Sequence, residues 1–290
     1  MNKTIDLNAD MGESFGSYKM GNDEKLLPLI SSANIACGFH AGDPNWMKHT
    51  VKTASEHNVE IGAHASYFDL RGFGRRSIPS SIQEIKNDIM YQMGALQAFS
   101  SSKSLQHLKP HGALYNDAVA NENIASAICD VIEEFNPEMY LLALSGSKWV
   151  EIAINRNINV AKEAFADRTL LKDGSLAPRY EKGAVLHDVD TVIENGIRIA
   201  KEGKALLKEG GTFDIFSEIS VNMDTKTIDF DAETVASITS ATTTINGSTS
   251  ANLRGATATV EGTTSNIKGT TVSLNGTTVD LDATTFLADA

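Results

Sequence analysis

The sequence predicts an α/β protein built from parallel strand–helix units, followed by a repetitive β-rich tail. Short apolar runs of strand length recur along residues 1–215, and stretches with helical periodicity separate several of them. At about residue 216 aromatic residues become rare and a short Thr/Gly repeat begins. We therefore expect two domains, at residues 1–215 and 216–290.

The apolar runs alternate with three helical stretches that carry start or stop signals. Pro44 follows Asp43 as in the first turn of a helix, Ser81 and Glu84 match a capping box, and Pro137 follows the third stretch. The expected strands are "TIDLN", "ANIAC", "EIGAH", "QHLK", "MYLLALSG" and "NVAKEAFA", and the expected helices span residues 44–57, 80–102 and 121–135. Six or seven such units indicate a closed or nearly closed barrel, with a doubly wound open sheet as the rival fold.

Composition excludes several classes of function. The net charge of −12 argues against nucleic acid or an anionic membrane as a partner. Cys37 and Cys129 are expected to be buried free thiols in a reducing compartment. The N-terminus has no apolar signal region, and no segment approaches the roughly 18–20 apolar residues of a membrane span. We therefore expect a cytoplasmic protein.

The tail has a repeat of one aliphatic residue and one glycine per unit. Its units are "INGSTSAN", "LRGATAT", "VEGTTSN", "IKGTTVS", "LNGTTVD" and "LDATTF". One aliphatic residue per unit cannot form a core within one chain, whereas several chains wound together can stack these residues along a common axis. The regular spacing favours a β-solenoid or trimeric β-helix over a disordered linker. The tail resembles the trimeric β-helix of phage baseplate spike proteins, which implies a homotrimer.

Candidate functional residues follow the expected strands, where active sites of parallel barrels lie. Asn8 and Asp10 alternate on the first strand and so share one face, with Glu13 just beyond. Acidic groups that point into a barrel are costly to bury unless they bind something. After the second strand, "ACGFHAGDP" places His40 and Asp43 in a loop that glycines allow to turn tightly.

The third, fourth and sixth strands end in further polar residues. His64 ends "EIGAH", and the loop after it carries a basic cluster at Arg75 and Arg76 that suits a phosphate or carboxylate. The other candidates, from "KPHGALYN" and "EAFADR", are Lys109, His111, Asn116, Asp167 and Arg168. Histidines at three successive strand ends indicate one shared polar site.

These motifs resemble the LamB/YcsF family, the A-subunit proteins of 5-oxoprolinase. The resemblance runs from residue 5 to about 207 and rests on "IDLNADMGESFG", "SANIACGFHAGDP", "IGAH", "GFGRR", "YQMGAL", "KPHGALYN" and "FADR…DGSLAPR". It implies a (β/α)7-type barrel of the glycoside hydrolase/deacetylase kind. It also implies ATP-dependent cleavage of 5-oxoproline to glutamate, together with the B and C subunits of 5-oxoprolinase.

ATP-dependent ring opening would need some residues to bind anions and others to transfer protons. We expect Lys109, Arg75 and Arg76 to bind the anions, and His40, His64 and His111 to transfer protons, with Asp10 and Asp43 orienting the imidazoles. The residues expected to contact substrate are Asn8, Glu13, Asp43, Arg75, Asn116, Asp167 and Arg168. An alternative use of the same site is a divalent metal held by Asp10, His40 and His64.

The resemblance is incomplete at its C-terminal end. Family members close with one more βα unit, whose strand ends in Cys-x-His-Gly-Asp, and this chain has no such motif after residue 187. The alternative function is therefore structural: a trimeric spike or fusion protein, native or chimeric, whose barrel head is inactive.

Overall fold

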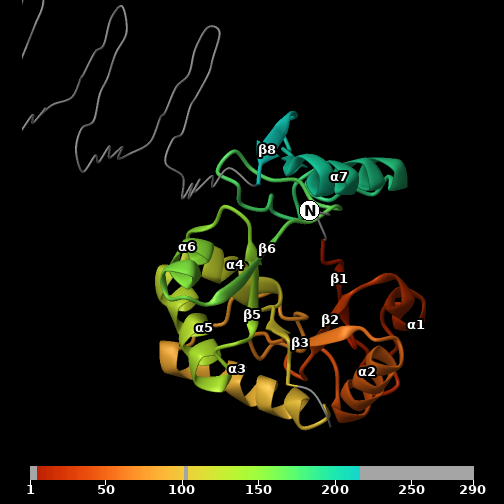
Figure 1. Ribbon diagram of the computed structural model, residues 1–290, viewed down its shortest axis with the longest axis vertical. Coiled ribbons are helices and arrows are strands. Elements are labelled where there is room, and N and C mark those ends of the chain that lie inside the picture. The colour runs from red at the N-terminus through yellow and green to blue at the C-terminus, as the bar shows by residue number, and fades with distance from the viewer. Residues whose placement is uncertain (1–4, 101–103, 216–290) are drawn as a thin grey trace, which may run out of the picture. The chain divides into compact units, whose positions relative to one another are not determined.

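Six parallel strands form one sheet, shown in Figure 1 on a computed structural model that describes residues 5–100 and 104–215. The strands are β1 (Asn8–Met11), β2 (Ser32–Ala36), β3 (Glu60–His64), β4 (His107–Leu108), β5 (Tyr140–Leu144) and β6 (Asn159–Glu163). Each strand pairs with the one that precedes it in the chain. This sequential order is that of a barrel wall, and it excludes the doubly wound alternative, in which the strand order reverses.

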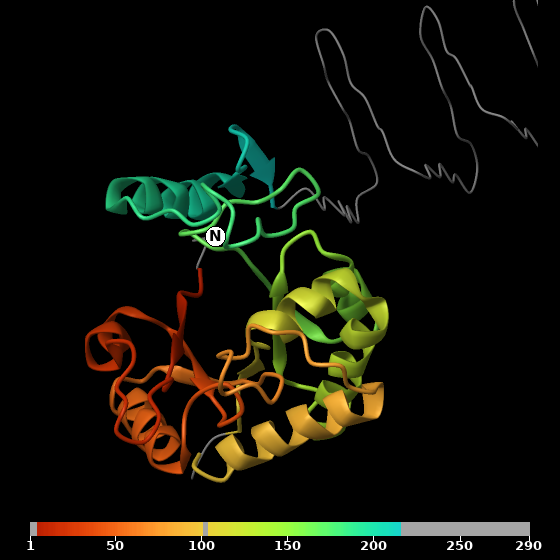
Figure 2. The same cartoon turned by 180° about the vertical axis from the view of Figure 1, so that it is seen from behind.

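Helices flank the outside of the curved sheet, as the two views of Figures 1 and 2 show, and the last helix that the structure describes packs instead against the short antiparallel pair that follows it. They are α1 (Asp23–Leu26), the short 3-10 helix η1 (Leu27–Leu29), α2 (Pro44–Glu56), α3 (Ile82–Gln97), α4 (Gly112–Ala120), α5 (Glu122–Phe135), α6 (Lys148–Asn155) and α7 (Val189–Glu202). The main core lies between sheet and helices. Its largest fully buried side chains include Ile35, Ile89, Leu108 and Trp149. Burying such side chains is the main favourable contribution to the stability of the fold.

The inner face of the sheet carries polar side chains on β1, β2 and β4. The Asn34 amide donates to Asn8 Oδ1 at 2.7 Å and to Asp10 Oδ1 at 3.0 Å, and its own oxygen lies 2.7 Å from His107 Nε2. Gly62 lets the His107 ring cross β3, because a Cβ at this position would lie 2.1 Å from the ring. The interior of the half-barrel is thus filled by a hydrogen-bonded network that supports the strand ends.

The local signals predicted several elements well. The third strand has the expected bounds, Asp43 caps α2 through Asn45 N and Trp46 N, and Ser81 forms its capping box with Glu84. Helix α3, at Ile82–Gln97, is shorter than the expected helix over residues 80–102. The first strand spans Asn8–Met11 and overlaps the expected run "TIDLN" only at Asn8.

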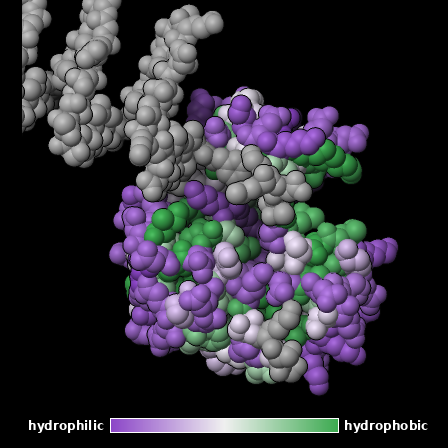
Figure 3. Space-filling view, viewed as in Figure 1, coloured by the Kyte–Doolittle hydropathy of each residue, from purple (hydrophilic) through white to green (hydrophobic). Residues whose placement is uncertain are grey.

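The seventh parallel strand of the expected (β/α)7 barrel does not occur in the described residues. After β6 the chain forms a long loop, α7 and an antiparallel pair, β7 (Lys204–Leu206) with β8 (Thr212–Asp214). Within this part Val189, Ile193 and Ile197 stay exposed along α7, where Figure 3 shows apolar surface. The predicted β-solenoid or trimeric β-helix falls in residues 216–290, outside the described residues.

Cys37 and Cys129 are buried free thiols, as expected, and burial raises the pKa of Cys37 to about 12. Among the described residues, no helix has both the length and the apolar character needed to cross a membrane.

Candidate active site

Three imidazoles from three successive strand ends meet at the rim of the half-barrel. The rings of His40 and His111 stack, with centroids 3.8 Å apart and an interplanar angle of 6°. His64 lies edge-on to both, at centroid distances of 5.4 Å and 4.7 Å. All three residues are buried. The expected convergence of the three histidines is therefore present.

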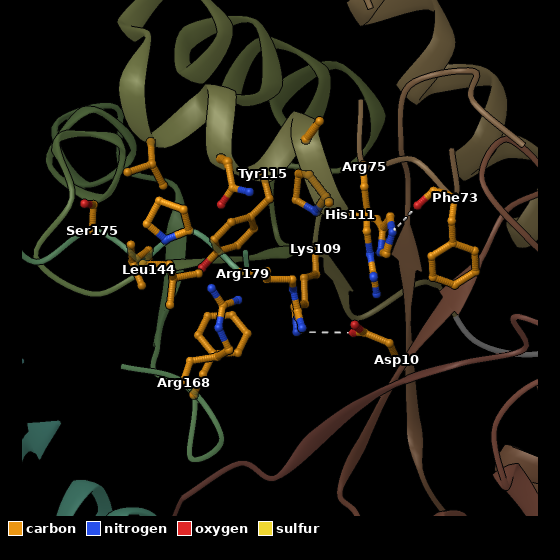
Figure 4. A pocket seen from close by; sticks show the side chains of 18 of the residues that line it. Asp10, Phe73, Arg75, Lys109, His111, Tyr115, Leu144, Arg168, Ser175 and Arg179 are labelled. Atoms are coloured by element: carbon orange, nitrogen blue, oxygen red, sulfur yellow. Dashed lines mark hydrogen bonds and ion pairs between the residues drawn. The ribbon is translucent and has the colours of Figure 1, made fainter. Parts of the chain in front are cut away.

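Backbone carbonyls fix the orientation of two of these rings. His64 Nδ1 lies 2.8 Å from the carbonyl oxygen of Lys109. His111 Nε2 lies 2.9 Å from that of Phe73, the contact drawn as a dashed line in Figure 4. A carbonyl only accepts hydrogen bonds, so both of these ring nitrogens carry protons. The opposite nitrogens, His64 Nε2 and His111 Nδ1, face one another at 2.9 Å.

A hydroxyl fixes the third ring. Ser66 Oγ donates to the Tyr67 carbonyl and lies 3.0 Å from His40 Nδ1, so it accepts from this nitrogen. His40 Nε2 therefore lacks a proton when the ring is neutral. It lies 3.2 Å from Glu13 Oε1. When neutral, all three rings thus place an unprotonated nitrogen close to Glu13, within 4.8 Å of one another and of its carboxylate.

Two carboxyl groups with opposite pKa shifts lie next to the imidazoles. Burial raises the pKa of Glu13. Burial also opposes ionisation of Asp10, but the charges of His64 and Lys109 outweigh it and hold the pKa of Asp10 well below its usual value. Burial lowers the pKa of His111 to about 2, with further lowering from His64. The His64 ring keeps a raised pKa in spite of its burial, because Asp10 Oδ2 lies 3.3 Å from its Nε2.

Lys109 is held by protein groups and is not a free cation. Its ammonium lies 2.6 Å from Glu163 Oε1 and 3.3 Å from Asp10 Oδ1, and it donates to Asn8 Oδ1 at 3.1 Å. Burial disfavours the charge, yet the two carboxylates overcome it and raise the pKa of Lys109. The charge of Lys109 is thus already balanced by protein carboxylates, and its predicted role in binding a substrate anion stays a prediction.

A cavity of about 560 Å³ opens beside the imidazoles (Figure 4). Strand ends form one part of its wall, and the loop between β6 and α7 forms another. Eight of the expected site residues line it: Asp10, Glu13, His64, Arg75, Lys109, His111, Asn116 and Arg168. His40 lies behind this wall and reaches it through Glu13.

Guanidinium groups make part of the cavity wall positive. Arg75, Arg168 and Arg179 all line it. Burial lowers the pKa of Arg168, with further lowering from the nearby charges of Arg179 and Arg75. Arg168 donates to the carbonyls of Ala177 and Ala184 and so secures the covering loop. Like charges this close favour an anion in the cavity.

Four expected residues lie elsewhere. Asn8 belongs to the network beneath the cavity, and Asp167 does not line it. Asp43 caps α2 and accepts from Gly16 N, so it does not orient the imidazoles as expected. Arg76 forms an ion pair with the buried carboxylate of Asp69 and does not line the cavity. Asp43 and Arg76 are used by local structure that the sequence pattern did not distinguish from a site.

Three further residues matter that the sequence reasoning did not select. Ser66 and the Phe73 carbonyl orient two imidazoles. Tyr115 is buried in the cavity wall, and burial together with the charge of Glu163 raises its pKa. Tyr115 lies within "KPHGALYN", so its position in that motif was the available signal. Nothing in the sequence marks a backbone carbonyl.

The fold and the site define a protein with a parallel α/β half-barrel whose strand ends carry an imidazole–carboxylate cluster in an anion-attracting cavity. The chain belongs to the LamB/YcsF family, whose profile matches residues 5–257. This match extends beyond residue 207, where the motifs end, and into the Thr/Gly-rich tail.

Named relatives are similar over most of their length. The chain is 49% identical to the 5-oxoprolinase A subunit of Natranaerobius thermophilus over 225 residues, which is 77% of this chain and 85% of that protein. It is 50% identical to the 5-oxoprolinase A subunit of Bacillus cereus strain 03BB102 over 203 residues, which is 69% of this chain and 80% of the relative. The crystal structure of the lactam utilization protein from Thermus thermophilus matches with a TM-score of 0.70 and 40% identity, covering 73% of this chain and 87% of that one.

Proposed function

We propose that the protein is the A subunit of an ATP-dependent 5-oxoprolinase, which hydrolyses 5-oxo-L-proline to L-glutamate together with partner subunits. The observation that carries the proposal is the cavity, which joins an imidazole–carboxylate cluster to a set of guanidinium groups. Similarity to the A subunits of 5-oxoprolinases at about half identity supports the same reaction.

The reaction requires two kinds of groups, and the cavity has both: the imidazole–carboxylate cluster and the guanidinium groups. A lactam is a poor electrophile, because amide resonance gives its C–N bond partial double-bond character. Transfer of phosphate from ATP to the lactam oxygen would activate the carbonyl for attack by water. This route needs cations for the phosphate and the substrate carboxylate, and groups that move protons at the attacked carbon and the leaving nitrogen.

The cations are Arg75, Arg168 and Arg179 in this proposal. Arg75 and Arg179 form no ion pair among residues 5–100 and 104–215, although the charge of Arg75 acts on Glu13, so both are available for a bound anion. Asn116 also lines the cavity and offers an amide to the substrate. The proton-transfer role predicted for His40, His64 and His111 stays a prediction. The lowered pKa values of His40 and His111 favour neutral rings, which accept protons or bind cations and do not donate.

ATP and the partner subunits belong to the same proposal. The chain has no GxxxxGK[ST] motif, so a nucleotide site would be of another kind or lie on the B or C subunit. A cytoplasmic location fits the use of ATP.

The tail adds a proposal about assembly. Its repeat supports a trimeric β-helix that would join three chains, whereas none of the relatives supports an inactive spike. Mass in solution, measured with and without residues 217–290, tests this part alone. A trimer that becomes a monomer on truncation is expected, and an unchanged mass would contradict the stalk.

The decisive experiment is release of glutamate from 5-oxoproline by the chain combined with the B and C subunits and ATP. We expect activity that depends on all components and that falls at least about 100-fold in His111→Ala. His57→Ala is the control, since His57 is an exposed histidine at the end of α2. Equal rates for His111→Ala and the wild type, or no ring opening with any combination of the subunits, would refute the proposal.

A further inference from the structure

Four potential ligand atoms lie close together at the strand ends. Three of the chain's seven histidines each contribute a ring nitrogen that is unprotonated when the ring is neutral, as described above. The fourth atom is Glu13 Oε1, 3.2 Å from His40 Nε2 and 3.8 Å from His111 Nδ1. His64 Nε2 and His111 Nδ1 are 2.9 Å apart, and all four atoms lie within 4.8 Å of one another.

Lone pairs that face one another in a buried site repel unless a positive species lies between them. Protons could relieve the repulsion only pairwise, one between His64 and His111 and a second between His40 and Glu13. A single cation satisfies all four atoms together. The clustering of four ligand atoms within 4.8 Å of one another therefore favours a cation over two separate protons.

We propose that Glu13, His40, His64 and His111 bind one divalent transition-metal ion of the zinc class. The ligand set differs from the Asp10, His40 and His64 set that the sequence suggested, since Glu13 and His111 replace Asp10. Asp10 is engaged by Lys109 and Asn34, and its Oδ2 lies beside the cluster, 3.3 Å from His64 Nε2. This proposal rests on ligand geometry and is independent of the proposed ring-opening reaction.

The dimensions of the cluster fit such an ion. Zinc–nitrogen bonds are about 2.0–2.1 Å, so ligand atoms around a tetrahedral ion lie about 3.3 Å apart. Three of the six separations, 2.9, 3.2 and 3.8 Å, lie around this value, and all six are within 4.8 Å. Three imidazoles with one carboxylate are typical of zinc, cobalt or nickel, whereas magnesium and calcium prefer oxygen alone.

The surroundings of the rings fit a metal site as well. Metal-binding histidines generally donate their second ring N–H to a carbonyl, carboxylate or water, which fixes the ring and its tautomer. Lys109 O and Phe73 O accept from His64 and His111, and Ser66 Oγ accepts from His40. Glu13, His64 and His111 also line the cavity, so a bound ion would be accessible to a small molecule there and could polarise a carbonyl or a water.

The test measures metal binding by the full chain without partner subunits. Protein purified without chelator is analysed for metals, stripped, and titrated with Zn²⁺ and Co²⁺. We expect one equivalent per chain and the visible absorption bands of low-coordinate Co²⁺. His64→Gln and His111→Gln should each weaken binding more than about 100-fold, and His57→Gln should leave it unchanged. Residues 216–290 contain no histidine or cysteine, so the tail adds neither imidazole nor thiolate ligands.

Nitrogen-15 NMR of the histidine side chains supplies a test on the wild-type chain that does not depend on the folding of variants. The geometry predicts binding through Nε2 of His40 and His64 but through Nδ1 of His111. Absence of stoichiometric metal after titration, or binding that persists in both histidine variants, would overturn the inference. Because no substrate or partner is present, failure here leaves the ring-opening proposal untouched.

Discussion

Lys109 Nζ lies 2.6 Å from Glu163 Oε1, and both side chains are buried, with 7% and 5% of their surfaces exposed. This ion pair connects the end of β4 to the end of β6 beneath the cavity. Removing one member of a buried pair leaves an uncompensated charge, which typically destabilises a protein by about 3–5 kcal/mol.

The first prediction concerns this pair. Glu163→Gln is expected to lower the free energy of unfolding by about 3 kcal/mol, the low end of the range, because Asp10 still balances Lys109. Lys109→Met should cost at least as much, since it leaves two carboxylates without their cation. Denaturant unfolding measures both. Glu56→Gln breaks the exposed pair with Lys52 and should change stability by less than about 0.5 kcal/mol. Equal effects at the buried and exposed pairs would contradict this interpretation.

The second prediction concerns the close approach of the Arg75 loop to the imidazoles. Gly74 has φ +64°, and a Cβ there would lie 2.8 Å from His111 Cδ2 and 2.8 Å from His40 Cβ. Gly74→Ala should therefore displace the rings and reduce ring opening by at least about 10-fold.

Gly210→Ala is the matched control for this change. Gly210 has φ +93° with no atom within 4 Å of its added Cβ, so it shares the backbone strain without the crowding. Stability should fall in both variants, and activity should fall only in Gly74→Ala. Full activity in Gly74→Ala would show that the rings tolerate displacement.

The third prediction tests the guanidinium groups. Arg75→Gln should raise KM for an anionic substrate, 5-oxoproline or ATP, by about 10-fold with little change in thermal stability, because it removes a cation from the cavity wall. Arg71→Gln is the control on the same loop, since Arg71 does not line the cavity. Steady-state kinetics with each substrate varied in turn identifies which anion Arg75 contacts, and an unchanged KM for both would remove Arg75 from the site.

The fourth prediction is a dependence of stability on pH away from the site. Asp130 on α5 lies 2.7 Å from Arg156 Nη2 and 3.1 Å from Lys86 Nζ. Burial opposes ionisation, but hydrogen bonds from these two cations prevail and lower the pKa of Asp130. A carboxyl group whose pKa is lower in the folded state stabilises the protein above its unfolded pKa of about 3.9, and this contribution is lost as the pH falls further.

Asp130→Asn should therefore reduce stability near neutral pH and flatten its decline in acid. The measurement is the free energy of unfolding between about pH 6 and pH 3 for both proteins. Asp190→Asn, on α7 away from this pair, serves as the control. Parallel pH profiles for the wild type and Asp130→Asn would rule out a contribution from this group.

Much of the head could be predicted because its signals are local. Asp43, Ser81 and Glu84 mark helix starts by hydrogen bonds within one turn, so three residues of sequence suffice. "EIGAH" has the length and composition of a buried strand in any parallel sheet. The meeting of His40, His64 and His111 could also be inferred, because parallel strands end at one edge.

Other features depend on partners far away in the chain. Asp43 and Glu13 are both acids close to a strand end, yet one caps a helix and the other faces His40. Lys109 has the sequence context of a free cation, but Glu163, distant in sequence, lies beside it. The number of parallel strands could likewise not be predicted from the periodicity of apolar residues. Whether a segment pairs with the edge of the sheet depends on the whole surface around it.

The sequence alone determined the βα alternation, the helix caps, the acidic character of the chain and the set of strand ends that carry histidine. Those properties follow from backbone preferences and apolar spacing over a few residues. Only the tertiary structure decided which nitrogen of each imidazole is unprotonated and which carboxylate faces it. The acceptors that settle this, Lys109 O, Phe73 O and Ser66 Oγ, act through spatial position. A carbonyl has the same chemistry at every residue, so its role is set only by what the fold brings within hydrogen-bonding distance.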